Sequence, residues 1–504
     1  MRLRHTILVA LLLVVGTTSF SVKNAIGQTR LGLHVTQEEL NVWKQRAASG
    51  PYRATGDVKS NSPGDWDKIT ANANSFLGNS SAQRWAGYTG AGCVPTDTSL
   101  GGILPNNGSW LQDAAFYYLV TGTLSYRTAV INELVAQAGV AGVNWANTAK
   151  WCIVAEDADN YFRPALWVTQ LIYAWDYILA GDQVYGQTVA AGSRTTIETW
   201  FLNAATMFQA DVAAYYASYI VNRDGSSWDN YTLTGDGTTR CNQDDVATWF
   251  GGTVMKLHSM SWNNRVLARV MPTAMVGIQQ NNASFKASAI RIFKEIIAYG
   301  VYPDNTPSEF ERWASDGDHP GYPLVYGYTM YGLMAQIADA FGRLGDTSLL
   351  DFSTLVGACG TAGGPKSLQG VLTQLSKHVD HTYLHYSGFA QDANHLFDTI
   401  DEVNGNNNIV LDQVMSQANL RYNDAYLKSV YMRTVAGKNG YTTPGYPASP
   451  STGSYYPWGG SWGIEPGTLF MFGQMEGKVS PYGGTTSSQL PAAPSNLVTN
   501  LPLP

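Results

Sequence analysis

The sequence predicts an all-α fold in which antiparallel helical hairpins form an incomplete barrel. Apolar residues recur at three- and four-residue spacing over most of the chain, strand-like alternation is scarce, and the helical segments lack a heptad repeat. Hairpins of such helices bury their apolar stripes against one another and close into a ring or an arc. No sequence repeat of fixed period is evident, so a regular solenoid is not expected.

The chain begins with the pattern of a secretory signal, residues 1–27. Arg2 and Arg4 form a basic start, residues 7–15 form an apolar core too short to span a bilayer, and residues 25–27 offer small side chains for cleavage. The mature chain is therefore expected to be secreted or periplasmic and to have no membrane partner. Cleavage removes three basic residues and no acid, which lowers the formal charge from −7 to −10 and argues against nucleic acid as a partner.

The first helical hairpin is expected in residues 107–139, with an interruption at residues 121–125. Ser193 or Thr195 is the expected N-cap of a later helix, and two others are expected to end at glycines. The remaining helices are predicted at 162–179, 194–220, 243–260, 264–280, 283–300 and 322–345. The last two of these are the ones expected to end at glycines, Gly300 and Gly345.

The composition changes after about residue 438. Residues 438–480 are rich in Gly, Pro, Ser and aromatic residues, which predicts an irregular C-terminal segment that closes the helical domain. Residues 481–504 are predicted to be a flexible linker, and within them residues 491–500 resemble the start of a fibronectin type III module. The four widely spaced cysteines exclude zinc ribbons and thioredoxin motifs, and leave disulfides or buried thiols open.

One charged stretch stands out in a chain of which only 14% is charged. It reads SEFERWASDGDHPGY and contains Glu309, Arg312, His319 and Tyr322. Acid–base chemistry needs unlike groups held close together, and the glycines and proline of this stretch can shape a loop that brings them to one site. A simpler interpretation is that Glu309 and Arg312 form an i,i+3 ion pair and that His319 lies on a surface loop.

A second stretch, HSMSWNNRV, opens a predicted helix. In the simpler interpretation, Asn263 or Asn264 is the N-cap of that helix. In the functional interpretation, the two side-chain amides and Arg265 hold a carboxylate by hydrogen bonds and charge, with His258 and Trp262 beside them.

In their order and separation, these motifs resemble those of the alginate lyases with an (α/α) toroid fold and of their glucuronan-cleaving relatives. The letters NNR at 263–265 match the first two positions of the family's Asn-Asn-His motif, and EFER at 309–312 matches its Glu-x-x-Arg element. The early segment AAFYYLVTGTLSYRTAV resembles the family's first helical hairpin, and the likeness spans residues 105–345. The resemblance implies an (α/α) toroid domain over residues 28–480.

The resemblance also implies a β-elimination on the uronic acid units of an anionic polysaccharide. The expected substrate is alginate, with mannuronate-rich polymer favoured, or glucuronan, and the product carries a 4,5-unsaturated uronate end. Asn263 and Asn264 would neutralise the C5 carboxylate so that the C5 proton becomes acidic. Arg312 would neutralise charge nearby or lower the pKa of a tyrosine, while a base takes the proton and an acid protonates the leaving oxygen at C4.

The chain departs from the family pattern at Arg265, which stands where the family has a histidine. Arginine stays protonated and cannot be the base. Either His319 or His258 replaces the histidine, or a tyrosine performs both proton transfers.

Tyr322 is the first choice for this tyrosine, with Tyr326 and Tyr328 as rivals, and each of the three is also compatible with a place in the core. Trp228 lies in a turn-like aromatic stretch and is expected to line a sugar subsite. The predicted catalytic set is Asn263, Asn264, Arg312, His319 and Tyr322. The residues expected to contact substrate are His258, Trp262, Arg265, Trp228, Tyr326 and Glu309.

A helix over residues 377–386 would place His378, His381 and His385 along one face. Such a face can be a metal site, a polar wall of a cleft or a solvated surface. No cofactor is predicted, and no metal is assigned to the site residues.

Two other classes of function remain open. The acids at 309, 311, 316 and 318 could form the carboxylate pair of a glycoside hydrolase, although the Asn-Asn-Arg turn then has no role. A non-catalytic polysaccharide-binding protein would need the many aromatic residues but no proton-transfer groups. The P-loop, GxGxxG, HExxH and GxSxG motifs are absent from the sequence, and the oligomeric state stays open.

Overall fold

The computed structural model describes a set of segments that includes most of the predicted helices. The predicted signal, the expected helix at 243–260 and the four cysteines lie outside these segments, as do residues 438–480 apart from Met471. The described residues are 29–49, 65–85, 108–146, 159–219, 263–301, 304–307, 322–355, 365–379, 422, 424–427, 471, 481 and 482.

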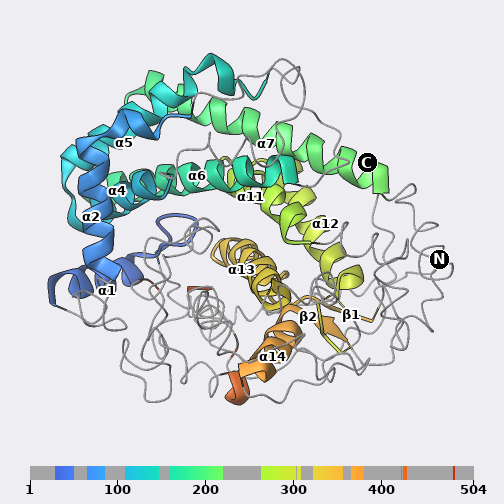
Figure 1. The fold of residues 1–504 in the computed structure, drawn as a ribbon. Helices are drawn as coiled ribbons and strands as arrows, with labels where there is room; N and C mark the ends of the chain where they lie inside the picture. The colour runs from blue at the N-terminus through green and yellow to red at the C-terminus, as the bar shows by residue number, and fades with distance from the viewer. Residues whose placement is uncertain are drawn as a thin grey trace, which may run out of the picture.

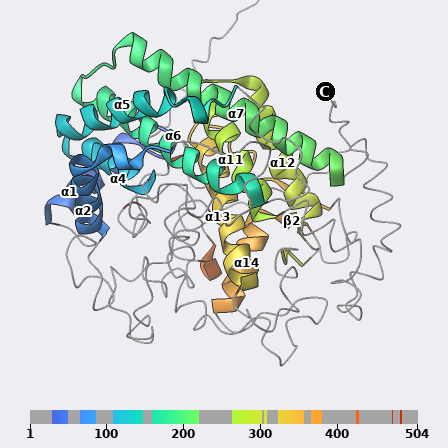
Figure 2. The ribbon, with the colours of Figure 1, turned by 45° about the horizontal axis from the view of Figure 1, so that its top comes forward.

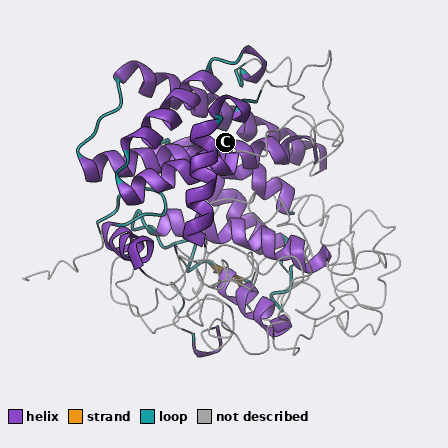
Figure 3. Ribbon diagram, turned by 60° about the vertical axis from the view of Figure 1, so that its left-hand side comes forward, coloured by secondary structure: helices purple, strands orange, loops and turns teal. Residues whose placement is uncertain are grey.

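The described part of the chain is mostly helical (Figure 3), which confirms the all-α prediction. Its two strands, β1 (Ser353–Thr354) and β2 (Lys366–Ser367), form one short antiparallel pair. The α-helices are α1 (Gln37–Ser49), α2 (Asp65–Gly78), α4 (Gly108–Thr121), α5 (Leu124–Ala138), α6 (Asp159–Tyr185), α7 (Ala191–Tyr219), α11 (Asn264–Gln279), α12 (Ala283–Tyr299), α13 (Tyr322–Gly342) and α14 (Leu368–Val379).

The expected interruption of the first hairpin is the turn between α4 and α5. Gly122 has a φ of +76° there, a conformation that residues with a Cβ rarely adopt. Its N–H donates to the Tyr118 carbonyl at 2.7 Å and closes the last turn of α4. The break is therefore set by one glycine, as the TGTLS sequence predicts.

The prediction for the start of α7 was wrong. Ser193 and Thr195 do not cap the helix, because α7 already begins at Ala191. The N–H of Arg194 donates to the Ala190 carbonyl at 3.0 Å, so the first helical hydrogen bond forms ahead of both predicted caps. The prediction for the end of α12 is confirmed, because Gly300 is the C-cap of that helix.

Gly345 has a φ of +88° and lies in the turn that follows α13, three residues after the helix has ended at Gly342. The prediction of a glycine at this boundary is confirmed, although the helix is shorter than its apolar pattern. At the start of α12, Asn282 is the N-cap, and its side chain accepts a hydrogen bond from the Phe285 N–H at 3.1 Å.

The helices pack in two layers that follow an arc in chain order (Figure 1). Among the described helices, the inner row consists of α4, α6, α11 and α13, each packed against the next. The outer row contains α5, α7 and α12, and Figure 2 shows α7 running along the outside of α11 and α12. Every residue of α11 from Asn264 to Ile278 is buried except Arg265, which is typical of a helix that is enclosed on all sides.

The inner helices α11 and α13 run in the same direction. The last residue of α11, Gln279, donates to Asp176 of α6 at 3.5 Å, and Gln336 near the end of α13 accepts from Tyr173 of α6 at 2.9 Å. The C-terminal ends of both helices therefore meet the same part of α6. Their N-terminal ends, at Asn264 and Tyr322, therefore point toward the opposite rim of the inner row.

Candidate functional site

The start of α11 is fixed by Asn263. This residue has extended backbone angles, and its Oδ1 accepts from the N–H groups of Arg265 at 3.0 Å and Val266 at 2.9 Å. These are the bonds of an N-cap, so the simpler interpretation of the Asn-Asn pair is confirmed for Asn263. Its side-chain oxygen is already occupied by the helix.

Asn264 is the first residue of α11 and is fully buried. Neither its Oδ1 nor its Nδ2 has a hydrogen-bond partner in the part of the chain that the structure describes. A buried amide without partners costs about 1–3 kcal/mol per unsatisfied group, so native proteins seldom retain one without a reason. Its hydrogen-bonding capacity is unused among the described residues, and a ligand that brings both a donor and an acceptor, or two acceptors and a water, would satisfy it.

A buried ion pair lies one turn further along α11. The guanidinium of Arg269 donates through Nη1 to Asp211 Oδ2 of α7 at 2.8 Å, and through Nε to the Arg265 carbonyl at 3.4 Å. Both side chains are almost completely buried. Burial raises the pKa of the Asp211 carboxyl, although the charge of Arg269 opposes this shift.

The sequence reasoning missed Asp211 and Arg269. The available signal was one acid and one base within otherwise apolar helical stretches, a position that ionised side chains occupy only when they are paired. Sequence alone gives no pairing for residues 58 positions apart.

The rim of the inner row therefore has the features of an anion site. The dipole of this 16-residue helix favours negative charge at its N-terminus, although the N–H groups of Arg265 and Val266 already donate to Asn263. Asn264 adds an unoccupied amide at that end, and Arg265, which is only partly buried, follows it. These groups can bind and neutralise a carboxylate, but none of them can act as a base at neutral pH.

The remaining predicted residues divide into two groups. Tyr322 and Tyr326 lie on the first turns of α13, the helix that packs on α11. The other predicted site residues lie outside the described residues; they are Trp228, His258, Trp262, Glu309, Arg312 and His319.

The predicted histidine face is only partly described. His378 belongs to α14, whereas His381 and His385 lie outside the described residues. Among the residues that the structure describes, no group of three His, Cys, Asp or Glu side chains is placed to hold a metal ion.

Comparison with protein-family models, with curated proteins and with solved structures finds no match to this chain. Within the described segments, no helix combines the length and apolar character needed to cross a membrane.

Proposed function

We propose that this protein is a secreted polysaccharide lyase that cleaves uronate-containing polysaccharide by β-elimination. The observation that carries the proposal is the fully buried amide of Asn264, which lacks hydrogen-bond partners among the described residues and sits at the N-terminus of a buried helix. A uronate carboxylate matches both features, because it accepts hydrogen bonds and carries negative charge.

The double row of helices supports an (α/α) toroid as the finer description of the fold. Its inner helices α6, α11 and α13 are each followed by a helix of the outer row or, for α13, by α14. This alternation is the pattern of stacked helical hairpins. It is also the architecture that the sequence resemblance implies.

The proposed reaction begins with the substrate carboxylate at the N-terminus of α11. Hydrogen bonds from the Asn264 amide and the positive field of the helix stabilise the charge that develops on the carboxylate as the C5–H bond breaks. The electron pair of that bond forms the C4=C5 double bond, and the C4–O bond breaks. The departing oxygen takes up a proton, so the products are one unsaturated end and one new hydroxyl end.

The base in this proposal is Tyr322, with His319 and His258 as the alternatives from the sequence. Support for Tyr322 comes from its position as the first residue of α13, an inner-row helix that packs on α11, whose first residue is Asn264. A tyrosine that both removes the C5 proton and returns it to the leaving oxygen would need no second acid.

The test measures ultraviolet absorbance while the full chain acts on polymannuronate, polyguluronate or glucuronan. We expect rising absorbance with one of these polymers, because β-elimination creates a conjugated unsaturated uronate. Asn264→Ala is expected to lower kcat by about 10²–10³, the loss typical of one donor that stabilises a developing oxyanion. Tyr322→Phe is expected to abolish the reaction.

Asn282→Ala is the matched control, since it removes the capping asparagine of a different helix, α12. Full activity in Asn282→Ala together with the loss in Asn264→Ala would assign the effect to the site. New reducing ends without absorbance would indicate a hydrolase, and the absence of both products would indicate a binding protein. Either of these two results would overturn the proposal.

A further inference from the structure

A second buried polar cluster lies at the opposite rim of the inner row, at the C-terminal end of α13. Arg343 donates to Glu39 of α1 through Nη2 at 2.9 Å and through Nη1, and to Asp339 Oδ2 through Nε at 2.7 Å. Asp339 also bonds to His34 Nδ1 at 2.6 Å and accepts from the Tyr482 hydroxyl at 2.6 Å. We call these five residues the ring clasp.

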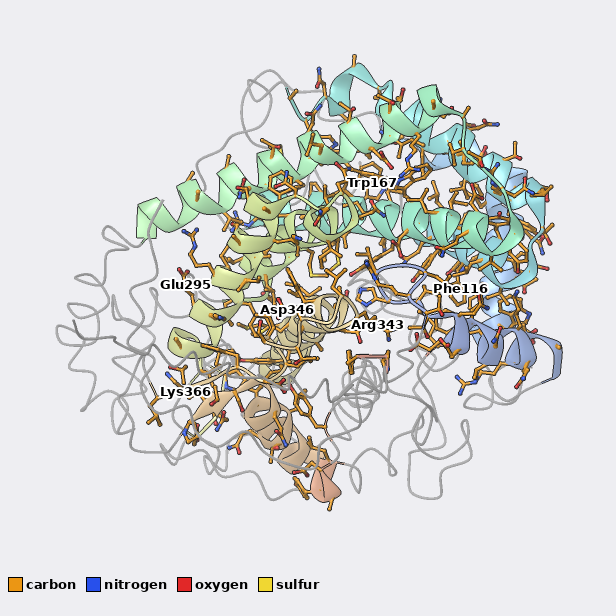
Figure 4. All side chains as sticks on the ribbon, turned by 180° about the vertical axis from the view of Figure 1, so that it is seen from behind. Phe116, Trp167, Glu295, Arg343, Asp346 and Lys366 are labelled. Carbon is orange, nitrogen blue, oxygen red and sulfur yellow. The ribbon has the colours of Figure 1, made fainter. Side chains whose placement is uncertain are left out.

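The ring clasp joins parts of the chain that are far apart in sequence. Glu39 and Arg343 are separated by 304 positions, and Tyr482 lies 143 positions beyond Asp339. Figure 4 shows Arg343 beside the segment of residues 29–36, between α13 and α1. Because α1 packs on α4, the first helix of the inner row, the clasp connects the last helix of that row to its first.

The segment of residues 29–36 also holds the clasp to α6. The Leu33 N–H donates to Asp176 Oδ2 at 2.7 Å. Gly32 leaves no room for a side chain, since a Cβ there would lie 2.3 Å from the same carboxylate oxygen. The ring of His34 packs edge-on against Tyr173 of α6, with ring centres 5.3 Å apart.

All five clasp residues are at most 5% exposed. Burial alone would raise the pKa of the Asp339 carboxyl, but Arg343, His34 and Tyr482 hold this pKa well below its ordinary value. Buried ion pairs are poor sources of stability relative to apolar contacts, and they are better suited to fixing one geometry, because a misplaced charge is costly. The clasp therefore defines where the end of α13 must lie.

We propose that Glu39, Asp339 and Arg343 are positioning residues, which fix the tilt of α13 and thereby the place of Tyr322 relative to Asn264. From Asp339 to Tyr322 the helix is about 26 Å long at 1.5 Å per residue. A tilt of about 5° at the clasp would move the far end by roughly 2 Å, and a displacement of about 1 Å can lower a catalytic rate about 10²-fold. The clasp acts at a distance and contacts no substrate.

The test compares Asp339→Asn with a matched control, Asp182→Asn, in the full chain. Like Asp339, Asp182 bonds both a guanidinium and a tyrosine hydroxyl: it accepts two bonds from Arg127 and one from Tyr118. It links α4, α5 and α6, and so joins neighbouring helices without closing the row. The pair separates a positioning effect from the general effect of weakening a buried ionic cluster.

The first readout is amide hydrogen exchange in the first two turns of α13. We expect at least tenfold faster exchange there in Asp339→Asn, and no change in Asp182→Asn, at a temperature where both proteins remain folded. Glu39→Gln is the second clasp variant, in case Asp339→Asn does not fold. Equal exchange at the start of α13 in clasp and control variants would overturn the inference.

The second readout rests on the proposed function, whereas hydrogen exchange does not. With the polymer that gives unsaturated ends, the clasp variants are expected to lower kcat about 10-fold to 100-fold with little change in KM, because α11 and its anion site are left in place. If no polymer is cleaved, hydrogen exchange still tests whether the clasp fixes the position of α13. Faster exchange with an unchanged kcat would overturn the catalytic part of the inference.

Discussion

At the scale of single residues, Asn263 and Asn264 have identical side chains in different surroundings. The Asn263 side chain accepts two hydrogen bonds from the backbone, whereas the Asn264 side chain has no hydrogen-bond partner among the described residues. Asn263→Ala removes two hydrogen bonds from the first turn of α11 and is expected to lower the free energy of unfolding by about 1 kcal/mol. Asn264→Leu replaces a buried amide without partners in the described structure by an apolar group of similar size. It is expected to raise the free energy of unfolding by about 1 kcal/mol.

Urea unfolding of the two variants and the wild type measures both changes. The lyase assay on the same samples should show that the stabilised Asn264→Leu protein has lost activity, which is the combination expected of a residue kept for function. A loss of stability in Asn264→Leu comparable with that in Asn263→Ala would mean that the Asn264 amide has a structural partner, and would remove it from the site.

The sequence could predict that one asparagine of the pair caps a helix, but not which one. That choice depends on the residue at which the chain enters helical geometry, and the two side chains are chemically identical. The pairings in the clasp and between Asp211 and Arg269 could not be predicted, because partners 304 and 58 positions apart are brought together only by the packing of whole helices. Charged residues in a sequence are more often solvated than buried.

At the scale of elements, the apolar periodicity predicted α4, α5, α6, α7, α11, α12 and α13 close to their observed positions. It was less informative at the ends, where individual capping bonds decide. The start of α7 at Ala191 precedes both of its predicted caps, and α6 extends beyond its apolar stripe at both ends, to Asp159 and Tyr185. Periodicity reports which face of a helix is buried, whereas the boundary depends on a few backbone groups.

The turn between α4 and α5 yields a prediction at this scale. In Gly122→Ala, the new Cβ would have to tolerate a φ of +76° and would lie 2.9 Å from the ring of Tyr185. That ring is held in place, since its hydroxyl donates to the carbonyls of Leu119 and Val120. We expect the free energy of unfolding to fall by about 1–3 kcal/mol.

Gly192→Ala is the control for this prediction. Gly192 lies in the first turn of α7, and nothing within 4 Å would meet an added Cβ. Alanine there is expected to stabilise the protein by about 0.5 kcal/mol, because it restricts the unfolded chain. Thermal unfolding of both variants measures the difference, and equal effects would show that the α4–α5 turn is not set by the glycine.

At the scale of the whole molecule, buried ionisable groups make stability depend on pH. The lowered pKa of Asp339 gives stability that is present above the ordinary pKa of aspartate, about 4, and is lost as the pH falls. Asp176 and Asp211 act in the opposite direction, because burial raises their pKa and their contribution is lost as the pH rises. At acidic pH, the dependence of stability on pH therefore combines contributions of opposite sign.

At alkaline pH, the dependence of stability on pH gives a simpler test, which concerns the buried amine of Lys366. Its side chain is fully buried, and its amine donates to the Ala298 carbonyl at the end of α12. Burial lowers the pKa of this amine to about 7. Between this value and the ordinary pKa of lysine, about 10.4, the unfolded chain binds one more proton than the folded chain, so stability rises with pH by up to about 1.4 kcal/mol per pH unit.

Lys366→Met removes this titration and should flatten the profile over the same interval. At pH 6 the variant is expected to be more stable than the wild type by about 2–4 kcal/mol, after the loss of the bond to Ala298 is subtracted, and the difference should shrink as the pH approaches 10. Lys286→Met, at a partly exposed position on α12, controls for the lost charge and the new methionine. Urea unfolding at pH 6, 8 and 10 measures the slopes, and parallel profiles for wild type and Lys366→Met would contradict a lowered pKa at this lysine.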